Sequence, residues 1–241
     1  MSNTLVWIIS IALIYFLAAS IGSFMLVTVM RGYRKESWVK GRSVCENCGK
    51  ELKWWELIPT FSFLMLGGKC SKCKTKIDPA HFISETGFGI LITTLAIRAI
   101  LTNTLTIPFL VSLIGWLIFW KNVMSDLMYY SVYSVEVFIA AIIVSIVNQC
   151  WIPVIVLIAL DIFLFSSDDF SCFGAGDIDV AILAYAILGR GLSMLNVAVF
   201  ASATAIMTYF LVIRKREDKR IPFVPFLFIG TVITYFGLTL I

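Results

Sequence analysis

Apolar runs follow one another along most of this chain and constrain its fold more than any other feature. Eight of them can be distinguished, at residues 5–29, 82–101, 105–120, 132–148, 151–166, 178–189, 192–213 and 223–241. A helix needs about 20 apolar residues to cross a bilayer. Hydrophobic residues make up 60% of the 241 positions and charged residues only 14%, which excludes a soluble globular enzyme, a disordered regulator and a fibrous protein. The sequence therefore predicts an all-α, polytopic integral membrane protein with about eight transmembrane helices.

One segment, residues 31–79, departs from this pattern. It carries 11 of the 19 Lys and Arg residues and is the one stretch expected to form a water-facing subdomain. We therefore expect three parts along the chain. These are a first transmembrane span over residues 1–30, a small cytosolic module over residues 31–79, and a seven-span membrane domain over residues 80–241.

The distribution of basic residues predicts the orientation of the spans. Eight spans place both termini on the same side of the membrane. If the N-terminus lies outside, 17 of the 19 Lys and Arg residues face the cytosol, as the positive-inside rule requires. The polar module then faces the cytosol. The net charge of +4 is explained by the basic residues on the cytosolic side of the protein. No nucleic-acid partner is expected.

Four cysteines in the polar segment form two CxxC pairs. Cys45 and Cys48 are separated from Cys70 and Cys73 by 21 residues, and this spacing is typical of a tetrahedral zinc site with four thiolate ligands. Neighbouring lysines favour the thiolate form. Because four cysteines leave no open coordination position, the zinc would be structural. Two unrelated pairs of reduced cysteines remain the alternative.

The stretch between the two CxxC pairs is apolar although it lies in the polar segment. Residues 54–59 read WWELIP and residues 61–66 read FSFLML. These side chains either form the core of the module or lie at the membrane interface, where Trp is favoured. We prefer the interfacial interpretation.

Two carboxylates near the predicted spans are the main catalytic candidates. Asp126 follows Lys121 before the fourth span, and Asp177 precedes the sixth, so the predicted topology places both at the cytosolic side. Gly174 and Gly176 allow a tight turn or a close backbone approach beside Asp177. Two facing carboxylates can share one proton, so that one activates water while the other donates to a scissile carbonyl. Alternatively, Asp126 is an interfacial carboxylate and Asp177 caps a helix.

The order of these motifs resembles that of the bacterial type IV prepilin leader peptidases, which are polytopic aspartic proteases of the membrane. Asp126 is similar to the first catalytic aspartate of that family, and Gly174-x-Gly176-Asp177 to the motif that contains the second. Further matching segments are Gly22-Ser23-Phe24 with Arg31, the two CxxC pairs around Ile58-Pro59, Pro79 with Glu85, and residues 221–226. Departures from the family pattern are Leu26, Glu56, Ser131-Val132-Tyr133 and Asp179.

This resemblance implies an activity. The family members are intramembrane aspartic endopeptidases that remove a short basic leader from prepilins or pseudopilins at the cytosolic face of the inner membrane. Asp126 and Asp177 would be the catalytic pair, residues 31–79 the zinc module and residues 80–241 the catalytic membrane domain. Some members then methylate the new N-terminus with S-adenosylmethionine, and the sequence leaves this second activity and cofactor open.

A basic leader needs an acidic partner on this protein. Asp168 and Asp169 precede Gly174, and Asp179 stands where the family usually has Lys. We expect these three residues to form an acidic patch that holds the Lys or Arg residues of the leader. In the alternative interpretation, Asp168 and Asp169 only solvate a loop and cap the next helix.

Two other functions fit the sequence less well. One is a non-catalytic membrane assembly factor in which the zinc module docks a partner. The other is a transporter with Asp161 or Glu136 as a proton relay. The depth of the carboxylates in the membrane distinguishes a transporter from a leader peptidase. A transporter needs its carboxylates near the bilayer midplane, whereas a leader peptidase needs Asp126 and Asp177 together near the inner interface.

Overall fold

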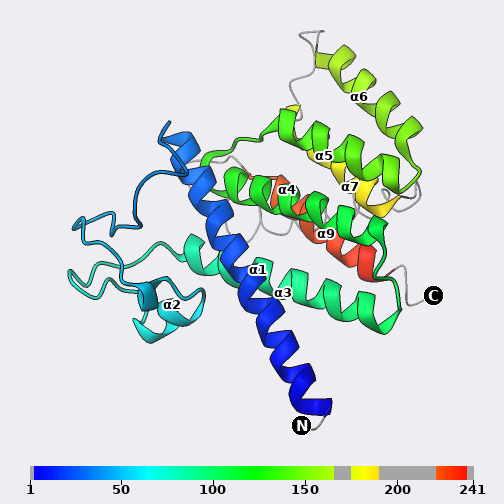
Figure 1. The fold of residues 1–241 in the computed structure, drawn as a ribbon. Coiled ribbons are helices and arrows are strands. Elements are labelled where there is room, and N and C mark those ends of the chain that lie inside the picture. The colour runs from blue at the N-terminus through cyan, green and yellow to red at the C-terminus, as the bar shows by residue number, and fades with distance from the viewer. Residues whose placement is uncertain (1–2, 166–174, 190–220, 238–241) are drawn as a thin grey trace. The chain divides into compact units, whose positions relative to one another are not determined.

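The structure is a computed structural model, and it describes residues 3–165, 175–189 and 221–237. The helices are α1 (Asn3–Tyr33), the 3-10 helix η1 (Trp54–Leu57), α2 (Phe61–Met65), α3 (Pro79–Leu101), α4 (Ile107–Tyr129), α5 (Ser134–Val147), α6 (Trp151–Phe165), α7 (Ala175–Leu188) and α9 (Val224–Gly237) (Figure 1). Within the described ranges, extended pairing is limited to two isolated β-bridges. The all-α fold class is therefore confirmed for the part of the chain that the structure describes.

Three helices are long and apolar enough to cross a membrane. They are Thr4–Tyr33 within α1, Pro79–Leu101 and Ile107–Tyr129. Helices α5 and α9 are apolar but shorter. The predicted span at residues 192–213 lies outside the described residues, so the count of eight spans stays a prediction.

The chain divides into two compact units, Met1–Thr104 and Leu105–Ile241. The first unit contains α1, the cysteine module and α3, and the second contains α4 to α9. Helix α3 thus lies with the first unit, whereas the sequence-based division grouped it with the later spans.

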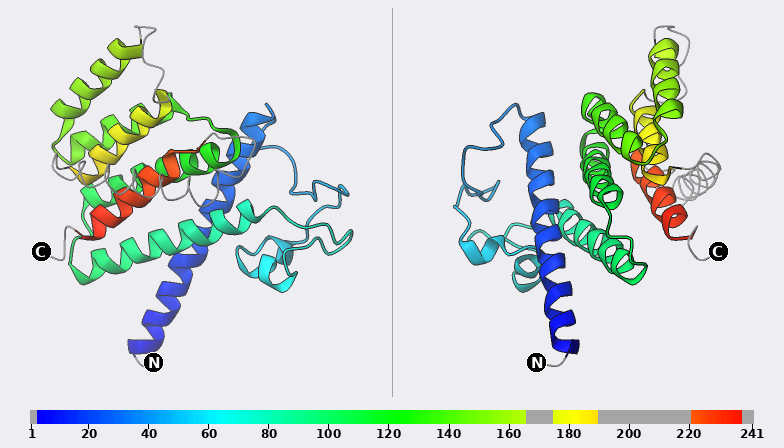
Figure 2. Two further views of the ribbon diagram at one scale, coloured as in Figure 1. Left: turned by 180° about the vertical axis from the view of Figure 1, so that it is seen from behind. Right: turned by 45° about the vertical axis from the view of Figure 1, so that its right-hand side comes forward.

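In the first unit, α1 and α3 pack side by side and cross near Gly22 (Figures 1 and 2). A Cβ atom at Gly22 would lie 2.5 Å from the Ser84 carbonyl oxygen and 2.9 Å from the Phe88 Cβ atom. The Ser84 hydroxyl also donates a 2.8 Å hydrogen bond to the Gly22 carbonyl. Small residues at such a crossing let two helix backbones approach closely, which is a common basis of helix association in membranes.

In the second unit, an aromatic cluster joins α4 to α9. The ring of Phe228 on α9 lies 5.7 Å from Trp116, 5.1 Å from Phe119 and 5.2 Å from Trp120 on α4, measured between ring centroids. All four residues are buried. Edge-to-face aromatic pairs at these separations add about 0.5–1.5 kcal/mol each to the gain from burial. The cluster therefore fixes α9 against α4, beside the segment of α4 that contains Asp126.

Helix α4 extends further than the sequence predicted. The apolar run ends near residue 120, but the helix continues to Tyr129 and ends where Tyr130 adopts a left-handed conformation. The polar residues in this extension have partners: Lys121 pairs with Glu136 at 2.6 Å, and the Asn122 side chain donates to the Ile118 carbonyl at 2.9 Å. Asp126 therefore lies within a helix and not in a connecting loop.

Helix α7 begins earlier than the predicted sixth span. The apolar run starts at residue 178, whereas the helix starts at Ala175. Gly176 and Asp177 consequently lie in its first turn. Gly174 lies outside the described residues, and so do Asp168 and Asp169.

Candidate active site and metal centre

Asp126 of α4 is buried and has a fixed hydrogen-bond partner. Its side chain is 6% exposed, and its Oδ2 atom accepts a 2.9 Å hydrogen bond from the backbone N–H of Val224. Val224 is the first residue of α9. The first N–H groups of a helix have no partner within that helix, so a carboxylate placed there satisfies one of them. This bond fixes the Asp126 carboxyl group relative to α9.

Asp177 lies in the first turn of α7 and is half-buried. Helices α4 and α7 pack against one another, and the two carboxyl groups are close enough for electrostatic repulsion between Asp126 and Asp177. The second unit thus brings together two acidic residues that are 51 positions apart in the sequence. Two carboxylates that lie close to one another can share a proton and act as an acid and a base.

Gly176 lets the first turn of α7 approach the loop between α4 and α5. A Cβ atom at Gly176 would lie 2.5 Å from the Cβ atom of Val132 and 2.6 Å from its Cγ2 atom. Real Cβ atoms do not approach other atoms so closely, so an alanine here would push α7 away from the loop. The second glycine of the Gly-x-Gly-Asp motif therefore has a steric role in this chain.

The loop that contacts Gly176 is held by polar residues of α4. The Asn122 Oδ1 atom accepts a 2.8 Å hydrogen bond from the Tyr133 backbone N–H, and the hydroxyl groups of Ser125 and Ser131 lie 3.0 Å apart. The Lys121 ammonium lies 4.1 Å from the centroid of the Tyr133 ring. Asn122 was not singled out in the sequence. The sequence did contain a sign of its role: Asn122 lies four residues before Asp126, about one helical turn away, in a stretch with few other amide side chains.

Replacing Gly176 with Ala is expected to destabilise the second unit by about 1–3 kcal/mol, the usual cost of overpacking. The measurement is thermal unfolding of the protein in detergent, followed by circular dichroism. Gly237→Ala is the matched control, since nothing lies within 4 Å of a Cβ atom at that helical glycine. Equal melting temperatures for the two variants would contradict the steric role of Gly176.

Three other acidic residues from the sequence differ in their surroundings. Glu136 pairs with Lys121 in the first turn of α5. Asp161 lies on α6, and its side chain is outside the described part. Asp179 is 3% exposed. It lies two residues after Asp177 in α7, and residues two positions apart point to nearly opposite sides of a helix. Its role in holding the leader stays a prediction from the sequence.

The four cysteines of the CxxC pairs meet in the first unit. The Sγ atoms of Cys45, Cys48, Cys70 and Cys73 all lie within 4.8 Å of one another, and those of Cys45 and Cys73 are 3.8 Å apart. A tetrahedral zinc ion with Zn–S bonds of about 2.3 Å separates its thiolates by about 3.8 Å. The cluster therefore fits a metal ion of the predicted kind, with four cysteine ligands.

The two CxxC turns have equivalent backbone geometry. The Cys45 N–H donates to the Lys50 carbonyl at 2.9 Å, and the Cys70 N–H donates to the Thr75 carbonyl at 2.9 Å. Isolated antiparallel bridges close both turns. In the second turn, hydrogen bonding from the side chain and backbone of Thr75 lowers the pKa of the Cys73 thiol to about 5. A thiol that ionises this readily is suited to metal binding, because the thiolate is the ligand.

A buried carboxylate supports the cysteine cluster. Glu56 accepts hydrogen bonds from the Lys50 ammonium at 2.7 Å and from the Lys53 N–H at 2.8 Å, and it also contacts the Ser71 hydroxyl. Lys50 lies beside the first CxxC turn and Ser71 lies within the second. Burial raises the pKa of Glu56, but these donors outweigh it and hold the pKa at about 2, against an ordinary value of 4.5.

Stability of the first unit is therefore expected to depend on Glu56 ionisation. Because the pKa is lowered in the folded state, the contribution is fully present above pH 4.5 and is lost as the pH falls towards 2. Glu56→Gln should cost about 3 kcal/mol at neutral pH, and the difference from the wild type should shrink in that acidic range. Melting temperatures measured against pH test this. Glu51→Gln is the control, since it removes an exposed pair with Arg42 and should have little effect.

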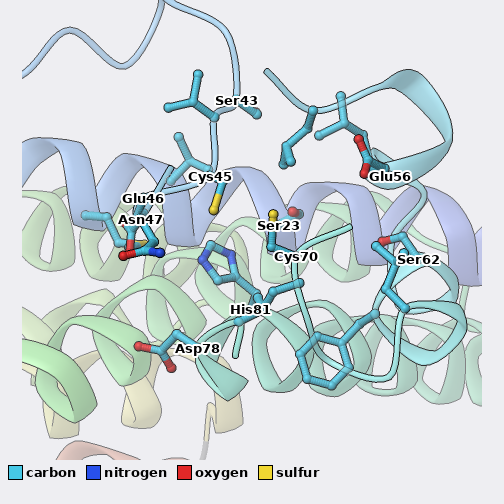
Figure 3. A pocket seen from close by; sticks show the side chains of 18 of the residues that line it. Ser23, Ser43, Cys45, Glu46, Asn47, Glu56, Ser62, Cys70, Asp78 and His81 are labelled. Atoms are coloured by element: carbon cyan, nitrogen blue, oxygen red, sulfur yellow. The ribbon is translucent and has the colours of Figure 1, made fainter. Parts of the chain in front are cut away.

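A cavity of about 570 Å³, lined by both polar and apolar residues, lies beside the cysteine cluster. Its lining includes Cys45, Cys70, His81 and Asp78, which are labelled in Figure 3. Ser23 and Glu85 also line it, and the Ser23 hydroxyl donates a 2.8 Å hydrogen bond to Glu85. The cavity is large enough for a small ligand.

Most of the first unit also matches a known protein family. Residues 16–99 match the family model described as the bacterial peptidase A24 N-terminal domain. A protein of Vibrio cholerae named prepilin leader peptidase/N-methyltransferase is 42% identical over 50 residues, which are 21% of this chain and 20% of that protein.

Two further relatives carry the same name. The Pseudomonas aeruginosa protein is 45% identical over 49 residues, which cover 20% of this chain and 17% of the relative. The Myxococcus xanthus protein is 35% identical over 78 residues, which cover 32% of this chain and 23% of the relative. The matches thus span about a fifth of the length of these relatives. No solved structure matches the chain. The resemblance to prepilin leader peptidases is therefore confirmed, and the family-model match lies in the N-terminal region.

Proposed function

We propose that this chain, whose residues 16–99 match the bacterial peptidase A24 N-terminal domain, is an intramembrane aspartic endopeptidase. It would remove the short basic leader from type IV prepilins or pseudopilins at the cytosolic face of the inner membrane. The observation that supports this best is the proximity of the Asp126 and Asp177 carboxyl groups. The names of the relatives support prepilin processing.

In this proposal the two aspartates divide acid and base catalysis between them. One carboxylate accepts a proton from a water molecule, whose oxygen attacks the scissile carbonyl carbon. The other carboxyl group is protonated and donates its proton to the carbonyl oxygen. The tetrahedral intermediate then breaks its C–N bond, and the new amine takes up the proton that the base had accepted. One hydroxyl of the intermediate returns its proton to the other aspartate as the new carboxyl group forms, which restores the starting state of the pair. The Val224 hydrogen bond to Asp126 would keep the pair oriented during these steps.

The four-cysteine module would bind a structural zinc ion and face the cytosol, with the N-terminus of the chain outside. The relatives are also named N-methyltransferases. We therefore include in the proposal a second step, in which S-adenosylmethionine provides a methyl group to the amine that cleavage releases. A non-catalytic assembly factor is not favoured, because the matching relatives carry enzyme names.

The experiment that tests the peptidase activity is incubation of the purified protein with a prepilin in detergent or vesicles. Loss of the leader is followed by mass spectrometry, with Asp126→Asn and Asp177→Asn variants alongside. Inhibitors of serine and cysteine proteases should have no effect on an aspartic mechanism. Incorporation of a labelled methyl group is measured separately, so the two activities are distinguished.

Asp168 and Asp169 lie outside the described residues, and their role in holding the leader is a proposal from the sequence. Replacing both with Asn is expected to raise KM for a basic-leader substrate with little change in kcat. The salt dependence of KM should also become flatter, because attraction between exposed charges is screened once the Debye length falls to about 3 Å at 1 M salt. An unchanged KM at low salt would mean that these residues only solvate the loop.

A further inference from the structure

The segment between the two CxxC turns presents an apolar surface. The side chains that are exposed between residues 54 and 66 are all apolar: Trp54, Leu57, Phe61, Leu64 and Met65. Its one charged residue, Glu56, is turned inward to Lys50. Exposed lysines flank the segment, at Lys53 and Lys69. A surface of this kind is unusual in a module that is otherwise rich in charge, and it indicates an apolar environment.

Contacts with α1 and α3 fix the position of this segment. The backbone N–H of Thr60 donates a 2.7 Å hydrogen bond to Glu85. The Thr60 hydroxyl lies 3.0 Å from the Tyr15 hydroxyl and 3.3 Å from that of Thr86. The residues of α3 in these contacts lie about 10 Å along the helix from its start at Pro79, at 1.5 Å per residue. Thr60 therefore lies beside the second turn of α3 and not at the first residue of the helix.

The backbone at Thr60 shows that this placement is imposed by the surroundings. Thr60 has a φ angle of 64°, which is rare for a β-branched residue. Such a conformation persists only where neighbouring groups determine it. Here the neighbouring groups belong to α1 and α3, two of the three described helices that are apolar and long enough to cross a membrane.

Part of the backbone of the segment is hydrogen-bonded internally. The N–H groups of Ser62, Leu64 and Leu66 donate to carbonyl groups within the segment, and those of Gly67 and Gly68, which follow it, also donate to its carbonyl groups. Non-helical backbone at membrane depth is tolerated where it is satisfied and packed against protein. On its inner side the segment covers the Glu85 carboxylate, which would otherwise face lipid at considerable cost.

We infer that residues 54–66 form a re-entrant segment that contacts the acyl chains of the membrane beside α1 and α3. Exposed apolar side chains are also present on α1, such as Leu13 and Leu17, and on α3, such as Ile83, and the segment would share their apolar environment. The segment then separates the cavity and Glu85 from lipid, while the cysteine cluster stays in water. The inference rests on the membrane location of α1 and α3, which is part of the proposed function.

The test is cross-linking of the full chain in vesicles of phosphatidylethanolamine and phosphatidylglycerol that carry a photoreactive diazirine on an acyl chain. Mass spectrometry then locates the modified residues. We expect cross-links at Leu64 and Met65 with yields comparable to those at Leu13 and Leu17. The inference is overturned if Leu13 and Leu17 react but residues 54–66 do not, or if these residues react only with a headgroup diazirine. If Leu13 and Leu17 also fail to react, the membrane location itself is wrong.

Two matched variants sharpen the result. Leu64→Glu should reduce acyl-chain cross-linking at Phe61 and Met65 by about tenfold, because a charged side chain is strongly disfavoured in the acyl region. Val39→Glu makes the same kind of change at an exposed residue of the module outside the segment, and it should leave the cross-links unchanged. Wild-type labelling in Leu64→Glu would show that the segment does not enter the acyl region.

Discussion

Replacing either Asp126 or Asp177 with Asn is expected to abolish leader cleavage while the protein still inserts and folds. A mechanism that needs one carboxylate as acid and one as base fails when either is an amide. Each single variant should therefore lose about 10³-fold or more in kcat/KM, and the double variant should be hardly worse. Leader loss in a purified assay measures this.

The structure provides a reason to choose Asn for this experiment. The side-chain oxygen of an Asn at position 126 can still accept the hydrogen bond from the Val224 N–H, so the contact between α4 and α9 survives. Melting temperature should consequently stay near that of the wild type. Glu51→Gln removes an exposed carboxylate of the first unit and should retain full activity. Near-normal turnover in Asp177→Asn would contradict the paired mechanism.

The cysteine centre could be predicted from the sequence because its geometry is local. Two CxxC turns form their own hydrogen bonds, such as Cys45 N–H to Lys50 and Cys70 N–H to Thr75, and the spacing between them is enough to close a four-ligand site. The role of Glu56 could not be predicted in this way. Its partners, Lys50 and Ser71, come from both turns, and only the folded module brings them together.

The surroundings of the two aspartates were harder to predict. The polar residues that follow the third apolar run, from Lys121 onward, indicated a loop. In the structure they have tertiary partners, such as Glu136 for Lys121, and α4 continues through Asp126. The contact between Gly176 and Val132 joins segments whose pairing no local pattern reveals. The start of α7 at Ala175 was not visible in the apolar run, because Gly176 and Asp177 precede that run.

The second large effect is expected at the cysteine centre. Purified protein should contain about one zinc ion per chain, bound by Cys45, Cys48, Cys70 and Cys73. Replacing Cys73 with Ser should release the metal, because three remaining thiolates leave a tetrahedral site incomplete. Elemental analysis of the purified variants measures the zinc content directly. Cys150→Ser is the matched control, since Cys150 is a buried cysteine of the second unit and its loss should leave the zinc in place.

Loss of zinc should unfold the module and lower activity without altering the chemistry. Metal binding is a large part of the folding free energy of small zinc modules, about 10–16 kcal/mol in zinc-finger peptides, and the module packs on α1 and α3 through Thr60 and Glu85. Cys73→Ser should therefore show a lower melting temperature and weaker substrate docking, while Asp126 and Asp177 remain intact in the other unit. Excess zinc should not restore the variant. A metal-free wild-type protein whose four cysteines react freely with a thiol reagent would show that the cluster is not a metal site.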